Sequence, residues 1–329
     1  MKPMHATGAV VAGLALVGLA LAAGPPALAE DYPARPVTIV VPYTPGGSTE
    51  ILSRIIGQRL EERLGKPVLI ENKPGAGTVI GASAVAKSAP DGYTLLMATP
   101  TPMAINVAVY KNLPYDPTDL VPLALLAQAP FILIVNPSLP VHSVPDLIQF
   151  ARKNPGQLSY GSGGVGAPHH LYAELFKSMT GIDMIHVPYK GSLPALNDVI
   201  AGHIQLMFCD VPPAAGMINA GKVRALGVST RARLDAFPQV PPIDEAVAGF
   251  DVAGWFMLVA PGETPRPIVD RLHGELQRIL ATPQMKDQIT RLSLLPMDDP
   301  SVEAMQSFVK SEIIRWAKVV QQAGIAGSE

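Results

Sequence analysis

The sequence predicts an α/β fold built from two lobes. Short apolar runs that are typical of buried strands alternate with helical segments along nearly the whole chain. At least five of these runs end in turns rich in Gly, Ser, Thr or Pro, directly before a helix. The strand–helix pattern starts again at Phe131, after a first series that ends near Ala129. About 300 residues follow the N-terminal segment, which is enough for two cores.

The first series opens with a strand over 37–41 and a helix over 48–64. The helix places Ile51, Leu52, Ile55, Ile56 and Leu60 on one stripe, and Gly65 is expected to end it. Further expected elements are a strand over 67–71, a helix from the Gly75–Thr78 turn to about Lys87, and a strand over 94–98.

The second series repeats this order. We expect a strand over 131–135, a helix capped by Ser143 with Pro145 in its first turn, a strand ending at Tyr160, a helix ending at Thr180 before Gly181, a strand over 184–187, a helix over 193–201 and a strand over 205–208. Because most strands are followed by helices, both sheets are predicted to be mostly parallel.

The C-terminal third has no comparable Gly-rich turn and is assigned to scaffolding. It contains an expected strand over 254–260 and helices over 265–280, 283–292 and 301–322. We predict that the chain crosses to a second lobe near Ala129 and returns near Asp251. The first lobe would then comprise residues 30–129 and 252–329, and the second lobe residues 130–251.

The N-terminus predicts a cleaved secretory signal over residues 1–29. Lys2 and His5 precede an apolar run over 8–23, and Ala27-Leu28-Ala29 provides the small residues of a cleavage site. The apolar run is shorter than the roughly 20 residues that a membrane-spanning helix needs. A retained membrane anchor is the less favoured alternative.

Composition argues against several functional classes. The formal net charge is −2 and basic residues form no cluster, which argues against nucleic-acid binding. The only cysteine, Cys209, excludes an intramolecular disulfide and a Cys-based zinc site. Cys209 lies in an apolar run and is best interpreted as a small buried hydrophobic residue.

The turn over 45–49 is the strongest candidate for a binding element. Gly46 and Gly47 permit close approach of a ligand, Ser48 and Thr49 add hydroxyl groups, and a helix N-terminus follows. Such a turn can bind a small anion. An ordinary βα turn with Ser48 or Thr49 as the N-cap is an equally weighted alternative. Glu50 is either a first-turn acid that stabilises the helix or a contact for an ammonium group.

Enzyme motifs are incomplete. Ser162 lacks the Gly two residues before it that a nucleophile elbow requires. The segment 216–222 has P-loop spacing, but Val223 replaces the magnesium ligand, and 161–166 is only weakly similar to a dinucleotide loop. His169 and His170 are adjacent and have no acidic partner at metal-ligand spacing, so lining the helix start is the favoured role. No catalytic residue, metal or cofactor is predicted.

Several motifs occur together in one order along the whole mature chain. They are Tyr32-Pro33-x-Arg35-Pro36, Pro45-Gly46-Gly47, Glu71-Asn72-Lys73-Pro74-Gly75-Ala76-Gly77, Ala89-Pro90-Asp91-Gly92-Tyr93, Leu113-Pro114-Tyr115-Asp116, Val187-Pro188-Tyr189-Lys190-Gly191, Ala220-Gly221-Lys222-x-Arg224-Ala225-Leu226 and Arg315-Trp316-x-Lys318-Val319-Val320. With these motifs the chain resembles the Bug family, the extracytoplasmic solute receptors of tripartite tricarboxylate transporters.

The resemblance implies a two-lobed periplasmic binding protein with a hinge, which closes over a carboxylate. It also implies a membrane permease of one large and one small subunit as partner. With the predicted signal over 1–29, we expect a monomer located in the periplasm. The ligand-binding residues carried over from the family are Tyr43, Gly46, Gly47, Ser48, Thr49, Ala76, Gly77, Thr78, Thr99 and Thr101 in the first lobe, and Ser162, Gly164, Val165, Gly166, Ala167, His170, Tyr189, Lys190 and Asp210 in the second.

Five positions depart from the family pattern. Glu50 stands where Asp is usual, Val79 and Val165 where Asn is common, Ala167 where Ser or Thr is frequent, and Asp210 where Asn is frequent. Because these changes remove hydrogen-bond donors and keep acids, we predict that the ligand is a mono- or dicarboxylate rather than citrate. Aromatic acids and acids that carry an amino group are among the options. A sensor that feeds a two-component system and, less favoured, a secreted α/β hydrolase are the alternatives.

Overall fold

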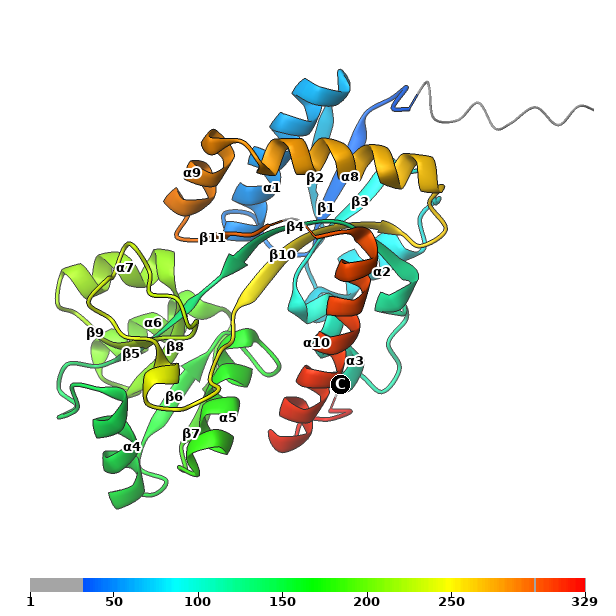
Figure 1. The fold of residues 1–329 in the computed structure, drawn as a ribbon. Helices are drawn as coiled ribbons and strands as arrows, with labels where there is room; N and C mark the ends of the chain where they lie inside the picture. The colour runs from blue at the N-terminus through cyan, green and yellow to red at the C-terminus, as the bar shows by residue number, and fades with distance from the viewer. Residues whose placement is uncertain (1–31, 299, 329) are drawn as a thin grey trace, which may run out of the picture. The chain divides into compact units, whose positions relative to one another are not determined.

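The computed structural model describes residues 32–298 and 300–328, and the predicted signal segment lies outside them. Residues 33–329 cluster into one structural unit that contains two sheets. Each sheet is flanked by helices, so the predicted two-lobed α/β class is confirmed (Figure 1). No helix among the described residues is both long and apolar enough to span a membrane.

The first lobe surrounds a six-stranded sheet with strand order β11-β4-β10-β3-β1-β2. Its elements are β1 (Val37–Val41), α1 (Ser48–Leu64), β2 (Val68–Asn72), α2 (Val79–Ala86), β3 (Thr94–Ala98), α3 (Asn106–Val109), β4 (Leu120–Ala129), β10 (Gly254–Pro261), α8 (Arg266–Leu280), α9 (Pro283–Arg291), β11 (Leu295–Pro296) and α10 (Val302–Gln322).

The second lobe surrounds a five-stranded sheet with strand order β7-β6-β8-β5-β9. Its elements are β5 (Phe131–Val135), α4 (Val144–Lys153), β6 (Ser159–Ser162), α5 (Pro168–Thr180), β7 (Ile185–Pro188), α6 (Ser192–Ala201), β8 (Leu206–Asp210), α7 (Val211–Asn219) and β9 (Arg224–Val228).

Both sheets are mixed rather than mostly parallel, which corrects that part of the prediction. The strands β1, β2 and β3 are parallel, as are β6, β7 and β8. The remaining strands β4, β5, β9, β10 and β11 pair antiparallel. Antiparallel neighbours do not need a helical crossover, and β4, β5 and β10 lie where the chain passes between the two sheets.

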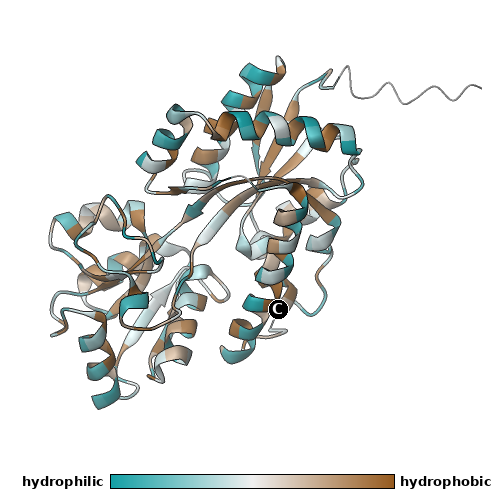
Figure 2. Cartoon of the chain, in the orientation of Figure 1, coloured by the Kyte–Doolittle hydropathy of each residue, from teal (hydrophilic) through white to brown (hydrophobic). Residues whose placement is uncertain are grey.

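Local sequence determines where most helices begin and end. Helix α1 ends at Gly65, whose φ of 69° is the left-handed conformation that glycine adopts without strain. Helix α4 begins after Ser143, whose hydroxyl accepts a 3.2 Å hydrogen bond from the Asp146 amide. Hydrophobic residues gather in the strands and on the inner helix faces, whereas the outer faces of the helices are hydrophilic (Figure 2).

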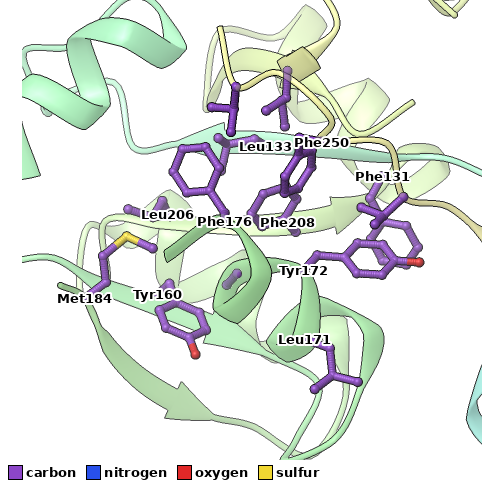
Figure 3. Close-up of a cluster of buried hydrophobic side chains, with 14 of the residues drawn as sticks. Phe131, Leu133, Tyr160, Leu171, Tyr172, Phe176, Met184, Leu206, Phe208 and Phe250 are labelled. Atoms are coloured by element: carbon purple, nitrogen blue, oxygen red, sulfur yellow. The ribbon is translucent and has the colours of Figure 1, made fainter. Parts of the chain in front are cut away.

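One buried hydrophobic cluster includes residues from both lobes. Its second-lobe part contains Phe131, Tyr172, Phe176 and Phe208 (Figure 3). Trp316 of α10 joins the same cluster and stacks on Tyr172, with ring centroids 5.6 Å apart. The C-terminal helix therefore packs against the second lobe as well as the first.

The chain passes between the sheets at two adjacent points. Strand β4 ends at Ala129 directly before β5, and Gly254 of β10 pairs with Ala129. A Cβ built at Gly254 would lie 3.2 Å from the Ala129 Cβ, so glycine permits this close approach. The lobe boundaries at Ala129 and Asp251 stay a prediction, which this strand membership supports.

Candidate functional site

The loops predicted to bind a ligand follow the carboxyl ends of parallel strands. Those of the first lobe, 43–49, 76–78 and 99–101, follow β1, β2 and β3. Those of the second lobe, 162–167, 189–190 and 210, lie at the ends of β6, β7 and β8. The carboxyl ends of parallel strands share one edge of a sheet, which is where open α/β sheets bind ligands.

The turn over 45–49 leads directly into helix α1. Gly47 is the N-cap residue, with φ −86° and ψ 167°, and no side chain caps the helix. The alternative in which Ser48 or Thr49 is the N-cap is therefore wrong. Within the described residues no group accepts from the amides of Gly47, Ser48 and Thr49. These amides are the unpaired donors expected at a helix start, where the helix dipole favours an anion.

Glu50 has a structural role in the same turn. Its Oε2 accepts a 2.6 Å hydrogen bond from the Gly46 amide, and its Oε1 accepts one of 2.7 Å from the Arg54 Nε. The Gly46 hydrogen bond and the Arg54 guanidinium lower the pKa of this buried carboxyl. The structure thus supports the helix-stabilising alternative for Glu50. The Gly46 amide is already used and is not open to a ligand.

We expect the substitution Glu50→Gln to lower both the melting temperature and the carboxylate affinity. The neutral amide accepts weaker hydrogen bonds than the carboxylate does, so the Gly46 turn is held less firmly. Calorimetric melting and ligand titration measure the two effects. The control is Glu62→Gln, which changes an exposed acid paired with Arg59 on the same helix and should alter neither.

The turn over 76–78 has an unusual backbone. Ala76, Gly77 and Thr78 have φ values of 44°, 55° and 79°, so two non-glycine residues are in the left-handed region. Tyr110 donates to the Ala76 carbonyl at 2.9 Å, and Asn106 Nδ2 donates to the Gly77 carbonyl at 2.9 Å. Strained backbone of this kind is concentrated at functional sites and persists where neighbouring side chains hold it.

Tyr43 connects two loops of the first lobe. Its hydroxyl lies 2.7 Å from Thr99 Oγ1, and its carbonyl accepts from Asn72 Nδ2 at 2.9 Å. Burial raises the pKa of the Tyr43 hydroxyl, hydrogen bonds from Thr99 and Thr101 oppose this, and the negative charge of Asp210 adds to it. The hydroxyl therefore stays neutral and is within electrostatic reach of a second-lobe acid.

The loop over 162–167 uses several of its own amides. The Gly164 amide donates to Ser162 Oγ at 3.1 Å, the Gly166 amide donates to His170 Nδ1 at 3.1 Å, and the Ala167 amide donates to the Gly164 carbonyl at 3.2 Å. Gly164 and Gly166 have φ values of 128° and 73°, which the loop requires. The amides of Gly164, Gly166 and Ala167 are therefore not open to a ligand, and Val165 at the tip of the loop is 49% exposed.

Two stacked histidines lie beneath this loop. The rings of His170 and His186 are 3.9 Å apart and nearly parallel at 7°, and Tyr160 stacks on His186 at 5.0 Å. Burial lowers the pKa of His170 to about 4 and that of His186 to about 4. Both rings are therefore neutral at pH 7. His170 supports the loop, and its predicted contact with a ligand stays a prediction.

Ser162 and His186 form a pair that the sequence did not reveal. Ser162 Oγ lies 2.6 Å from His186 Nε2. Ser162 is fully buried, and its hydroxyl also lies 3.0 Å from the Gly164 carbonyl. A nucleophile must reach its substrate, so this pair is suited to holding the loop rather than to catalysis.

The loops at 189–190 and 210 contain the cation Lys190 and the acid Asp210, and Tyr189 contacts a second acid, Asp198 of α6. The Tyr189 hydroxyl donates to Asp198 Oδ2 at 2.6 Å, and burial raises the pKa of Tyr189 to about 12. Lys190 is exposed and pairs with no described residue. Asp210 Oδ2 lies 3.0 Å from His169 Nε2, a partner that the sequence analysis missed. The sequence did contain one sign of this role for His169, because that residue lies in the first turn of α5, directly after a glycine-rich loop.

The second-lobe loop over 162–167 approaches the first lobe. A Cβ built at Gly166 of the second lobe would lie 3.7 Å from Val109 of α3 in the first lobe. The electrostatic effect of Asp210 on Tyr43 also spans the two lobes. In contrast, a surface hollow between α1 and α8, lined by Arg59, Arg63 and Arg278 among others, contains none of the predicted residues. Its Arg63 and Arg278 are paired with Glu275.

No group of three or more His, Cys, Asp and Glu side chains within residues 32–298 and 300–328 could hold a metal ion. The site is thus described by backbone amides, hydroxyls, one lysine and the Asp210–His169 pair. These groups can bind a small anion and hold it in a defined orientation.

Comparison with known proteins agrees with this description. BugT of Bordetella pertussis is 34% identical, over 94% of this chain and 97% of its own length. A Rhodopseudomonas palustris protein, Rpa4515, solved with adipate, is 42% identical with a TM-score of 0.81, over 90% of this chain and 99% of that one. MatC from Rhodopseudomonas palustris, solved with bound malate, is 31% identical with a TM-score of 0.76, over 88% and 100%.

The family model described as the tripartite tricarboxylate transporter family receptor matches residues 52–325, which include every candidate loop except the one over 43–49. The resemblance to Bug proteins is therefore confirmed, and the chain belongs to the tripartite tricarboxylate transporter receptor family.

Proposed function

We propose that this protein is a periplasmic receptor that binds a small mono- or dicarboxylate between its lobes. It then delivers the ligand to a permease of one large and one small subunit. The observation that carries the proposal is the placement of strand-end loops in both lobes, with Gly166 of the second lobe beside Val109 of the first. The matched proteins are receptors and not enzymes.

The energetics favour a site shared by both lobes. Micromolar affinity corresponds to about 8 kcal/mol. A hydrogen bond to a charged group contributes about 1.5–3 kcal/mol, and association costs at least about 4 kcal/mol. The three open amides over 47–49 cannot supply the balance alone, so the second lobe must contribute. Ligand occupancy is then linked to closure of the lobes.

The donor groups also restrict the ligand. The first lobe offers amides at the α1 N-terminus, and the second lobe offers the exposed Lys190. Asp210 adds negative charge, which opposes a ligand with three carboxylates. The relatives solved with adipate and with malate support a dicarboxylate of four to six carbons. We therefore place citrate outside the ligand range.

Isothermal titration tests this function. Native mass spectrometry of the purified mature protein first detects any retained ligand, which is then removed by unfolding, dialysis and refolding. Succinate, malate, adipate and benzoate are then titrated beside citrate, and at least one mono- or dicarboxylate should bind with a Kd in the micromolar range or below. Submicromolar citrate binding without competition from any smaller acid would contradict the proposed ligand class, and no binding by any acid would contradict the receptor function.

We propose the periplasm as the location and a monomer as the working state. The family assignment supports the location, as does the predicted signal segment over 1–29, which lies outside the described residues. The proposed site needs residues from one chain only.

A further inference from the structure

Asp210 is at a helix start but does not cap its helix. It is the N-cap residue of α7, and its side chain makes no capping hydrogen bond. An N-cap acid normally accepts from the amides two or three residues later. Here these residues are Pro212 and Pro213, which have no N–H. The helix therefore gives the Asp210 carboxylate no local partner, and capping does not explain the acid.

His169 holds this carboxylate in place. Its Nε2 lies 3.0 Å from Asp210 Oδ2, and because a carboxylate only accepts, Nε2 is the donor. The imidazole packs edge-on against Phe131 with ring centroids 5.2 Å apart, and Phe131 in turn contacts Tyr172 (Figure 3). The His169 side chain is only 11% exposed, so its orientation is set by packing.

Two further observations indicate a polar environment that no protein group completes. His169 Nδ1 and the Tyr172 hydroxyl are buried and have no hydrogen-bond partner among the described residues. Residues 169 and 172 share one face of α5, and both contact Phe131. A Cβ built at Gly163 would lie 3.4 Å from both His169 Nδ1 and the Ser192 amide nitrogen, so the loop after β6, helix α5 and the start of α6 meet there.

Asp210 remains an available acceptor in this environment. Burial raises its pKa, but the charge and hydrogen bond of His169 and a hydrogen bond from Ser192 outweigh burial and lower it overall. The carboxylate is thus ionised at neutral pH. Its side chain is 36% exposed, in contrast to His169. A carboxylate can accept about four hydrogen bonds, so the His169 hydrogen bond leaves capacity for another donor.

We propose that Asp210, positioned by His169, accepts a hydrogen bond from an ammonium or hydroxyl group of the bound acid. The ligand is then an amino- or hydroxycarboxylate rather than a plain acid. This inference rests on the proposed receptor function and specifies the ligand class for the same site. An acid that brings no donor would leave the remaining acceptor positions of Asp210 unfilled and place the ligand carboxylate beside a second negative charge, which disfavours binding.

Two matched ligand series test the proposal by isothermal titration. Succinate, malate and aspartate have four carbons and differ at one position, as do adipate, 2-hydroxyadipate and 2-aminoadipate with six carbons. In the series that fits the site, a donor-bearing acid should bind about tenfold to a hundredfold more tightly than the plain acid. The hydroxyl and ammonium members distinguish the two donors.

The variant Asp210→Asn identifies the residue responsible. It keeps an oxygen that can accept from His169, but it removes the charge. We expect the preference for the donor-bearing acid to fall at least fivefold, while the affinity for the plain acid is unchanged or rises. The control Asp183→Asn removes one charge from an exposed position of the same lobe and should leave the preference unchanged.

The outcomes separate the two claims. If plain acids bind as tightly as their donor-bearing partners, or if Asp210→Asn keeps the full preference, the role of Asp210 is overturned while the receptor function stands. If no acid of either series binds to the wild-type protein, the proposed function fails for these ligands and the role of Asp210 fails with it.

Discussion

Replacement of Gly47 by Val is expected to weaken carboxylate binding at least about a hundredfold, which corresponds to about 2.7 kcal/mol. Gly47 precedes the open amides of Ser48 and Thr49, and a Cβ built on it meets no atom within 4 Å. The added side chain would therefore occupy the space through which a ligand approaches. A loss of one or two hydrogen bonds to a charged group is enough for this effect.

The same substitution should change stability little. The Gly47 φ of −86° and ψ of 167° are extended values that valine adopts readily. Only the weaker N-cap preference of valine acts against folding, so the melting temperature should fall by no more than about 2–4 °C. The control Gly274→Val adds the same side chain to α8, where nothing lies within 4 Å either. Unchanged affinity in Gly47→Val would remove this turn from the site.

Acid should destabilise the second lobe between about pH 6.5 and pH 4. His170 and His186 have a pKa of about 4 when folded, against 6.5 for an ordinary histidine, because their stacked rings are buried. Within this range the unfolded chain binds protons that the folded chain excludes. The contribution of these two histidines to the free energy of unfolding is therefore constant above pH 6.5. It falls as the pH drops from 6.5 to 4, and it levels off below pH 4.

The expected loss is on the order of a few kcal/mol, after reduction for partial exposure of the rings. Lys177 disfavours protonation of both rings, whereas Glu174 favours protonation of His186. Urea unfolding at a series of pH values measures the slope. The variant His186→Gln should flatten it, and His203→Gln, an exposed histidine paired with Asp198, should not. An equal slope in both variants would show that the stacked pair does not control acid stability.

Helices with clear boundary residues were predictable from the sequence. Helix α1 was expected over 48–64 and occupies those residues, because its apolar stripe and Gly65 give the same answer. Helix α5 likewise ends at Thr180 before Gly181, whose φ is 67°. Strand β4 was missed, since Pro122 and Pro114 interrupt the pattern around it and a ten-residue run gives no period that distinguishes strand from helix.

The candidate loops were predictable as segments but not as arrangements of atoms. Glycine-rich turns after apolar runs located residues 45–49 and 162–167. Which amides remain open to a ligand depends on side chains that are distant in sequence or that lie beneath the loop and accept from its amides. The pairing of His169 with Asp210 joins positions 41 residues apart, and the stack of His170 on His186 depends on how β7 packs beside α5. Neither contact can be predicted from the spacing of these residues along the chain.

The backbone conformation of residues 76–78 could not be predicted from the sequence either. Glycine at position 77 suggested a turn, but the left-handed conformations of Ala76 and Thr78 oppose their intrinsic preference. They are held by Tyr110 and Asn106, about 30 residues further along the chain. Tertiary contacts therefore override local propensity at this loop of the proposed site.

Amide chemical shifts in the ¹⁵N-labelled mature protein test most directly whether both lobes hold the ligand. On titration with the tightest-binding acid, the amides of Ser48 and Thr49 should shift together with those of Val165 and Lys190, at one common Kd. Amides on the distant helix α9 should not move. Shifts confined to the loops of a single lobe would contradict a site shared between the two.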